Sequence, residues 1–350
     1  MTAAVTERQS SDEHARAGPV DLWTLERDAW AVDCMTPEEA ATQRPALPTR
    51  RHRRASVSLR LFAYAAMAVA LFLGGWWTRG VLQGGPSTVS DPLAAVLLPD
   101  KGVTLDARWG DLPRRLAQSG VIDIEKFKEA AERAGSPLTA AQLRMLTERS
   151  DEVLHIDASN AYFVLDLLWA LGLANDNPIL TRGPMAQRGS DQAGRYASTG
   201  GWTIGAKPGP QYLAALKLIR LTPQQQAIAE EVAFNSYRPC CGNMTAFPDC
   251  NHGMAALGLA ELMASQGASA DQVFWALKEV SPFWFPAQYH HLALYFEGQE
   301  QRWDEVDPRL VMGQDYSSAA GWREVDAWLQ QEGVLTGTGP GGGKTSGCAP

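Results

Sequence analysis

The sequence predicts a mainly α protein in which one N-terminal transmembrane helix is followed by a helical globular domain. Apolar residues make up 45% of the 350 residues and charged residues 20%, a composition typical of a chain that forms a hydrophobic core. Residues 61–78 carry no charge, as expected of a membrane span. From about residue 95 apolar residues recur at helical spacing, and few segments alternate as strands do.

Residues 56–83 are expected to form the membrane anchor, because their uncharged stretch is just long enough to cross a bilayer. Only Arg79 follows the stretch closely, whereas five arginines precede it: Arg50, Arg51, Arg53, Arg54 and Arg60. The positive-inside rule therefore predicts a single-pass protein of the inner (cytoplasmic) membrane, with its C-terminal domain outside the cytoplasm. A cleaved signal peptide is the alternative, but the leader of about sixty residues is too long for one.

The chain divides into five predicted segments by composition. They are a cytoplasmic, largely disordered tail at 1–55, the transmembrane anchor at 56–83, a linker at 84–94, the helical extracytoplasmic domain at 95–335, and a flexible Gly-rich tail at 336–350. The last segment ends close to Cys348. A thiol on such a tether is either idle or able to reach the internal cysteines.

Helical periodicity with start and stop signals predicts the helices of the domain. The segment 160–173 is nearly all apolar and is expected to be the central buried helix, being too short for a second membrane span. Val153 to Ile156 is the segment that most resembles a strand. The predicted helices cover residues 122–134, 138–149, 160–173, 222–237, 250–266, 270–280, 286–297 and 317–331.

The net charge of −8 argues against nucleic acid as a partner. Residues 1–60 contain nine arginines and nine acidic residues, so the whole deficit belongs to the rest of the chain. The membrane, contacted through the single span, is the partner that this part of the sequence predicts.

A cluster of sulfur and imidazole groups marks residues 240–254. It contains three of the five cysteines of the chain, one of its six histidines and two methionines: Cys240, Cys241, Cys250, His252, Met244 and Met254. Soft ligands of this kind favour copper, with zinc as the alternative, over magnesium or calcium. We expect Cys240, Cys241, Cys250 and His252 to bind the metal, with Met254 or Met244 as a thioether ligand.

Two other interpretations of the cluster remain open. In an oxidising compartment the cysteines also suit a disulfide, most simply from Cys250 to Cys240 or Cys241. The third interpretation is a catalytic thiolate at Cys250, assisted by His252. Asp249 is expected to cap a helix whose first residue is Cys250, and the helix dipole would then stabilise the Cys250 thiolate.

Two features outside the cluster have open roles. Asp166 interrupts the apolar helix at a position expected to be buried, and it suits either an ion pair or a functional site. The adjacent pair His290 and His291 lies among aromatic residues, where a structural role is the expected one.

Five motifs carry a resemblance that covers most of residues 95–350. They are YRPCCGN (237–243), FPDCNHGMAALGL (247–259), NPILTRGP (177–184), STGGW (198–202) and YSSAAGW (316–322). Together they resemble a family of uncharacterised bacterial membrane-anchored extracytoplasmic proteins with a CC-x8-C-x-H cluster and a Gly-rich, Cys-containing tail. The resemblance implies no particular activity.

The predicted function is soft-metal binding in metal handling or metal-dependent redox chemistry at the outer face of the membrane. A thiol enzyme or disulfide-exchange protein that uses Cys250 is the first alternative. The second is an anchored interaction domain whose cysteines form structural disulfides.

Overall fold

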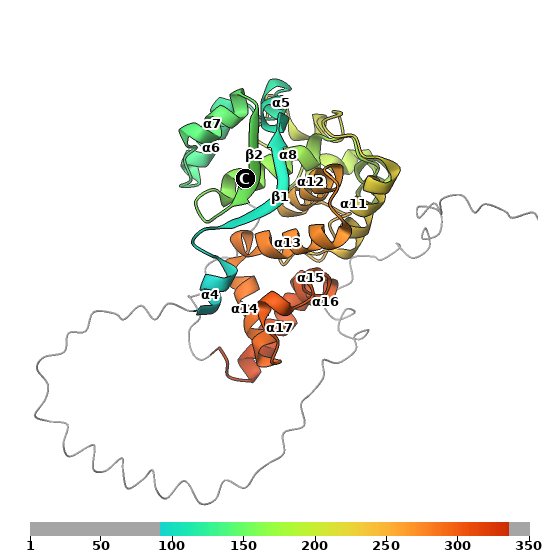
Figure 1. Cartoon of the computed structure of the whole chain (residues 1–350). Helices are drawn as coiled ribbons and strands as arrows, with labels where there is room; N and C mark the ends of the chain where they lie inside the picture. Colours follow the sequence, from blue (N-terminus) through green and yellow to red (C-terminus); the bar gives the residue numbers. More distant parts are fainter. Residues whose placement is uncertain (1–91, 336–350) are drawn as a thin grey trace, which may run out of the picture. The chain divides into compact units, whose positions relative to one another are not determined.

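The computed structural model describes residues 92–335, which are mainly helical, as the sequence predicts (Figure 1). The predicted cytoplasmic tail, membrane anchor and Gly-rich tail with Cys348 lie outside the described residues and stay predictions. Among residues 92–335, no helix combines the length and the apolar character that crossing a membrane requires.

A two-stranded antiparallel sheet belongs to the N-terminal part of this region. The elements there are α4 (Pro92–Leu97), β1 (Val103–Gly110), α5 (Leu112–Gln118), α6 (Ile124–Arg133), α7 (Ala140–Thr147) and β2 (Ser150–Ile156). Val103 pairs with Ile156 and Gly110 with Ser150. The predicted strand at 153–156 is confirmed within β2. Its partner β1 was not predicted, although its buried residues alternate: Leu105, Ala107 and Trp109.

The helices predicted from the sequence are all present, with ends that differ by a few residues. α13 runs on to Trp284, four residues beyond its predicted end, with Pro282 inside the helix. The remaining elements are α8 (Ala161–Ala174), α9 (Pro178–Arg182), α10 (Pro184–Gln187), η1 (Ser190–Arg195), η2 (Gly209–Gln211), α11 (Pro223–Asn235), α12 (Asn251–Ser265), α13 (Ala270–Trp284), α14 (Pro286–Gly298), η3 (Trp303–Glu305), α15 (Pro308–Met312), α16 (Gln314–Ser317) and α17 (Ala319–Gln331).

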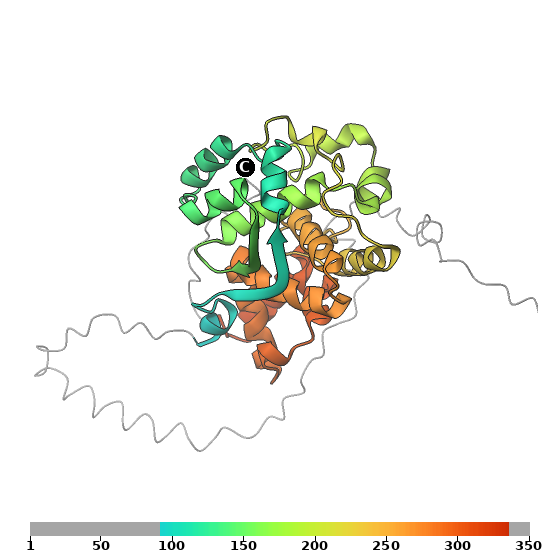
Figure 2. The ribbon, with the colours of Figure 1, turned by 45° about the horizontal axis from the view of Figure 1, so that its top comes forward.

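α8 and α12 form the centre of the core. α8 is the buried helix expected from its apolar sequence, and α12 packs against α8, α11 and α13. Figures 1 and 2 both show α13–α17, in orange and red, gathered on one side and the two-stranded sheet with α5–α8 on the other. α12 therefore holds the two groups together, and its N-terminus is fixed from several directions.

Two glycines let α8 and α12 approach so closely. A Cβ atom on Gly172 would lie 2.0 Å from the carbonyl oxygen of Met254, and one on Gly258 would lie 2.1 Å from that of Leu168. Real Cβ atoms do not come so near to backbone atoms, so any side chain here would push the helices apart.

We predict that Gly258→Ala lowers the free energy of unfolding by about 1–3 kcal/mol, because the helices must separate to accept the methyl group. Urea unfolding followed by circular dichroism measures the change. Gly194→Ala is the matched control, since its Cβ would lie 3.6 Å from Pro210, an ordinary contact. Equal stability of the Gly258 variant and the control would contradict the close crossing.

Candidate functional site

The candidate site is formed by the segment between α11 and α12 together with the first turn of α12. A backbone bridge between Tyr237 and Met244 closes residues 238–243 into a loop. Next to this bridge, the amide of Thr245 donates to the carbonyl of Ser236 (2.8 Å), and the two hydroxyls lie 2.8 Å apart. The RPCCGN motif is therefore the tip of a hairpin-like loop.

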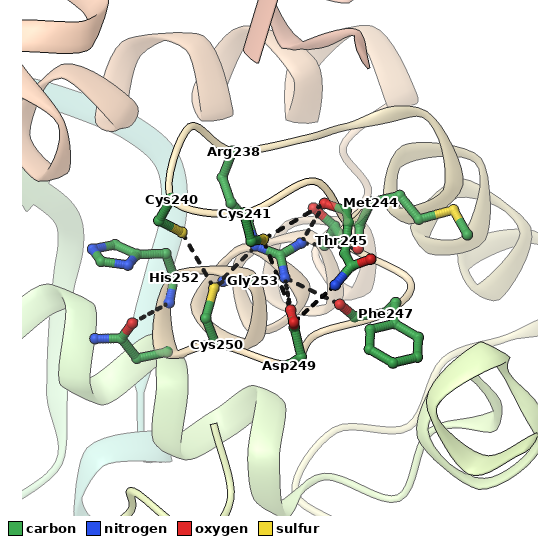
Figure 3. Close-up of polar contacts among 12 residues, drawn as sticks. Arg238, Cys240, Cys241, Met244, Thr245, Phe247, Asp249, Cys250, His252 and Gly253 are labelled. Carbon is green, nitrogen blue, oxygen red and sulfur yellow. Dashed lines mark hydrogen bonds and ion pairs between the residues drawn. The ribbon is translucent and has the colours of Figure 1, made fainter. Parts of the chain in front are cut away.

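The guanidinium group of Arg238 lies at the centre of this loop (Figure 3). The residue is only 3% exposed. Its Nε donates to Cys250 Sγ (3.1 Å), and Nη1 donates to the carbonyls of Asn243 and Met244 (both 2.9 Å). Nη2 donates to the Phe247 carbonyl (3.0 Å) and to Asp249 Oδ1 (2.5 Å). These five contacts match the five N–H donors of the side chain, so every donor of the buried cation is satisfied.

The surrounding acidic groups keep Arg238 charged. Burial lowers the pKa of Arg238, but the cysteine thiols, Cys250 above all, and the Asp249 carboxylate raise it by more. Burial in turn raises the pKa of Asp249, against the opposing effect of Arg238. The amide of Asn243 donates to the second oxygen of Asp249 (2.8 Å), which fixes the carboxylate in place.

Cys250, and not Asp249, caps α12, so the cap predicted from the sequence is wrong. The Gly253 amide donates to Cys250 Sγ (3.4 Å). Asp249 is drawn away because its carboxylate pairs with Arg238 and Asn243. A sulfur that accepts N–H bonds at a helix N-terminus is stabilised as a thiolate.

Gly253 gives the guanidinium room to lie against the first turn of α12. A Cβ atom at this position would come within 2.4 Å of Arg238 Cζ. The glycine of the CNHG sequence is thus required by the close approach of the arginine.

The structure brings together Cys240, Cys250 and His252. The sulfurs of Cys240 and Cys250 lie 3.4 Å apart, and the potential ligand atoms of the three residues all lie within 4.8 Å of one another. Cys240 is exposed and Cys250 is buried. The group is therefore open to solvent on one side and covered on the other.

His252 is held by aromatic rings. Its ring centroid lies 4.3 Å from that of Phe285 and 6.2 Å from that of Trp284. Its Nδ1 is buried and has no hydrogen-bond partner among residues 92–335. A buried imidazole nitrogen without a hydrogen-bond partner is a candidate ligand for a metal ion.

Cys241 belongs to a second group, with Asp249 and Cys250. Its sulfur lies 3.8 Å from Asp249 Oδ1. Hydrogen bonding to Cys240 lowers the pKa of Cys241, but hydrogen bonding to Cys250 and burial outweigh it and raise that pKa to about 12. In the metal-free protein this thiol therefore stays protonated at neutral pH.

The two methionines are placed differently. Figure 3 shows the Met244 side chain pointing away from the cysteine sulfurs, so a thioether ligand from Met244 is not supported. Met254 is completely buried in the hydrophobic core. Its role as a ligand stays a prediction.

Two backbone hydrogen bonds that the sequence did not predict connect the site to distant segments. The Ser198 amide of the STGGW motif donates to the Asp249 carbonyl (3.1 Å), and the Ala319 amide of YSSAAGW donates to the Cys241 carbonyl (2.9 Å). Arg238 was also missed, although a single arginine directly before Pro-Cys-Cys is a signal that can be recognised.

The other candidates lie apart from this loop. Asp326 Oδ1 lies 2.8 Å from His291 Nδ1, and the ring of His291 stacks on Trp322, contacts that suit the structural role expected from the sequence. Asp166 is 5% exposed and is hydrogen-bonded to Tyr162. No ion-pair partner of Asp166 is found within residues 92–335, so these residues do not support the ion-pair interpretation.

Comparisons with known proteins do not identify the chain: no protein-family model, no curated protein and no solved structure matches it. The resemblance to the anchored bacterial family therefore stays a prediction.

We predict that Arg238→Lys lowers the free energy of unfolding by about 3 kcal/mol, because an ammonium group cannot replace the fork of donors and leaves buried acceptors unpaired. Thermal and urea unfolding measure the loss. Arg302→Lys is the control, since that side chain is 71% exposed and a surface ion pair contributes about 0–1 kcal/mol. A loss no larger than the control's would show that the loop does not depend on the guanidinium.

Proposed function

We propose that this protein binds a soft metal ion, copper first and zinc second, through Cys240, Cys250 and His252. One observation carries the proposal: two sulfurs 3.4 Å apart and an imidazole all lie within 4.8 Å of one another. The role would be metal handling or metal-dependent redox chemistry at the outer face of the cytoplasmic membrane.

The spacing of the ligand atoms supports this proposal. With metal–sulfur bonds of about 2.3 Å and tetrahedral angles, two thiolates on one ion lie about 3.8 Å apart. The present separation needs to open by only a few tenths of an ångström. A ring nitrogen of His252 lies within 4.8 Å of both sulfurs, so the imidazole is close enough to supply the third ligand.

The number of ligands distinguishes the metals. Two thiolates and one imidazole form a complete set for Cu(I), which accepts three soft ligands. A Zn²⁺ ion needs a fourth ligand, which Cys241 supplies in a closed site and water in an open one. If the ion is Cu(I), Cys241 contributes little to its binding. If the ion is Zn²⁺ with Cys241 as the fourth ligand, the Cys241 thiol must lose its proton when the metal binds.

The charge of the loop also suits a cation. Two thiolates and the Asp249 carboxylate carry three negative charges, and Arg238 supplies one positive charge. The surplus of negative charge attracts a metal ion. Arg238 donates to Cys250 Sγ, and the same sulfur also lies next to Cys240 Sγ, where the ion would bind. N–H bonds to a ligating sulfur fix its position.

The location at the membrane rests on the sequence alone. The uncharged residues 61–78 and the arginines before them support an anchor with the metal-binding domain outside the cytoplasm. Copper and zinc would then be exchanged with the extracytoplasmic space.

We predict that Cys250→Ser and His252→Ala each weaken binding of Cu(I) by at least about tenfold, because each removes a direct ligand. Competition with a chromophoric Cu(I) chelator under reducing conditions measures the affinity, and the same titration with Zn²⁺ compares the two metals. His155→Ala is the matched control, since His155 lies on β2 beside Asp157, outside the cluster. Unchanged affinity in both cluster variants would contradict the proposal.

A second function is favoured by the same pair of sulfurs. Thiol–disulfide exchange needs one exposed cysteine close to a second one. Cys240 is exposed, and its sulfur lies 3.4 Å from the sulfur of the buried Cys250. The predicted attack by Cys250 on an external substrate does not fit its burial. In this arrangement Cys240 would attack an incoming disulfide and displace one substrate thiolate. The Cys250 thiolate would then attack Cys240 in the mixed disulfide and displace the second substrate thiolate, which leaves a Cys240–Cys250 disulfide.

The metal titration also separates these alternatives. A protein that binds no metal and cycles between dithiol and Cys240–Cys250 disulfide with a substrate would be a disulfide-exchange protein. One in which the cysteines stay oxidised and inert, so that they only stabilise the fold, would be the anchored interaction domain.

A further inference from the structure

A cavity separate from the cysteine sulfurs lies between α6, α8 and the segment 201–204. Its volume is about 490 Å³, within the range of small-molecule sites. Tyr162, Asp166 and Trp169 line it from α8, one turn apart, and Trp202 faces it from the loop. Asn251 is the residue that α12 contributes to its wall.

Asp166 is the unusual group in this cavity. The residue is 5% exposed and its carboxyl group receives a hydrogen bond from Tyr162, yet no cation pairs with it among the described residues. Burial raises the pKa of Asp166 to about 7, with Tyr162 opposing the shift. A buried carboxyl group without a countercharge is costly and is a mark of a ligand site when it faces an accessible cavity.

The aromatic residues are fixed with their polar atoms already engaged. The indole nitrogen of Trp169 donates to the Ser198 carbonyl (2.7 Å), and that of Trp202 donates to the Val121 carbonyl (2.8 Å). The two rings meet edge to face, with centroids 4.7 Å apart. Their contribution to a ligand is therefore made by the ring surfaces, which attract apolar groups and cations.

We propose that this cavity binds a small organic cation, an amine with an aromatic or aliphatic body, whose ammonium group pairs with Asp166. The body of the amine would lie against Trp169 and Trp202. A divalent metal does not fit, because a single carboxyl group is too small a ligand set. An anion does not fit either, since the cation at the cavity, Arg133, is 70% exposed and lies 3.8 Å from Glu129.

Titration calorimetry of the purified full-length protein with 2-phenylethylamine and tryptamine, at a pH above 7, tests the proposal. We expect saturable binding of at least one amine. Binding should be at least about tenfold weaker in Asp166→Asn, because asparagine keeps the shape of the side chain and the oxygen that accepts from Tyr162 but removes the charge. Asp304→Asn, an exposed aspartate paired with Arg302, is the matched control and should bind as the unmodified protein does.

Two further comparisons keep the result decisive. Ala130→Phe should block binding by filling the cavity while the Asp166 side chain is kept, which covers the case in which the Asp166 variant fails to fold. The uncharged 2-phenylethanol and the anionic phenylacetate should bind at least about tenfold more weakly than the amine. No saturable binding of either amine, equal binding of the alcohol, or full binding in the Asp166 variant would overturn the proposal.

Discussion

The candidate site depends on the hydrogen bonds and the ion pair that the buried guanidinium group of Arg238 makes. Taking a cation out of water is costly, and only complete hydrogen bonding with opposite charge nearby offsets the cost. Here three backbone carbonyls, the Asp249 carboxylate and the Cys250 sulfur provide both. The loop wraps around the arginine because each carbonyl it turns inward finds a donor there. The cysteines on either side are positioned as a consequence.

The core extends this constraint to the rest of the fold. α12 begins at the cysteine loop and crosses α8 at two glycines, so the first turn of α12 cannot shift without disturbing the centre of the protein. Backbone bonds from Ser198 and Ala319 hold the loop from two other segments. A site fixed in this way keeps its ligands close before any metal binds, which reduces the ordering that binding requires.

Much of the fold and part of the site could be predicted from the sequence, because both leave local signals. Cys240, Cys250 and His252 lie within thirteen residues, so their proximity follows from the chain itself. The long helices follow from periodicity. The cap of α12 was missed because Asp249 is a good cap in isolation, and only the distant side of the loop supplies the arginine that draws it away. The cavity beside Asp166 was missed for a similar reason. Its walls come from α6, α8 and residues 201–204, and their packing has no local signature.

Metal-edge X-ray absorption of the copper-loaded protein tests the central claim most directly, because it counts the atoms bound to the ion. The arrangement of Cys240, Cys250 and His252 predicts two sulfur ligands at about 2.3 Å and one imidazole nitrogen. In Cys250→Ser the sulfur contribution should fall by half. A shell made only of nitrogen and oxygen, or a sulfur signal unchanged in that variant, would contradict the site described here.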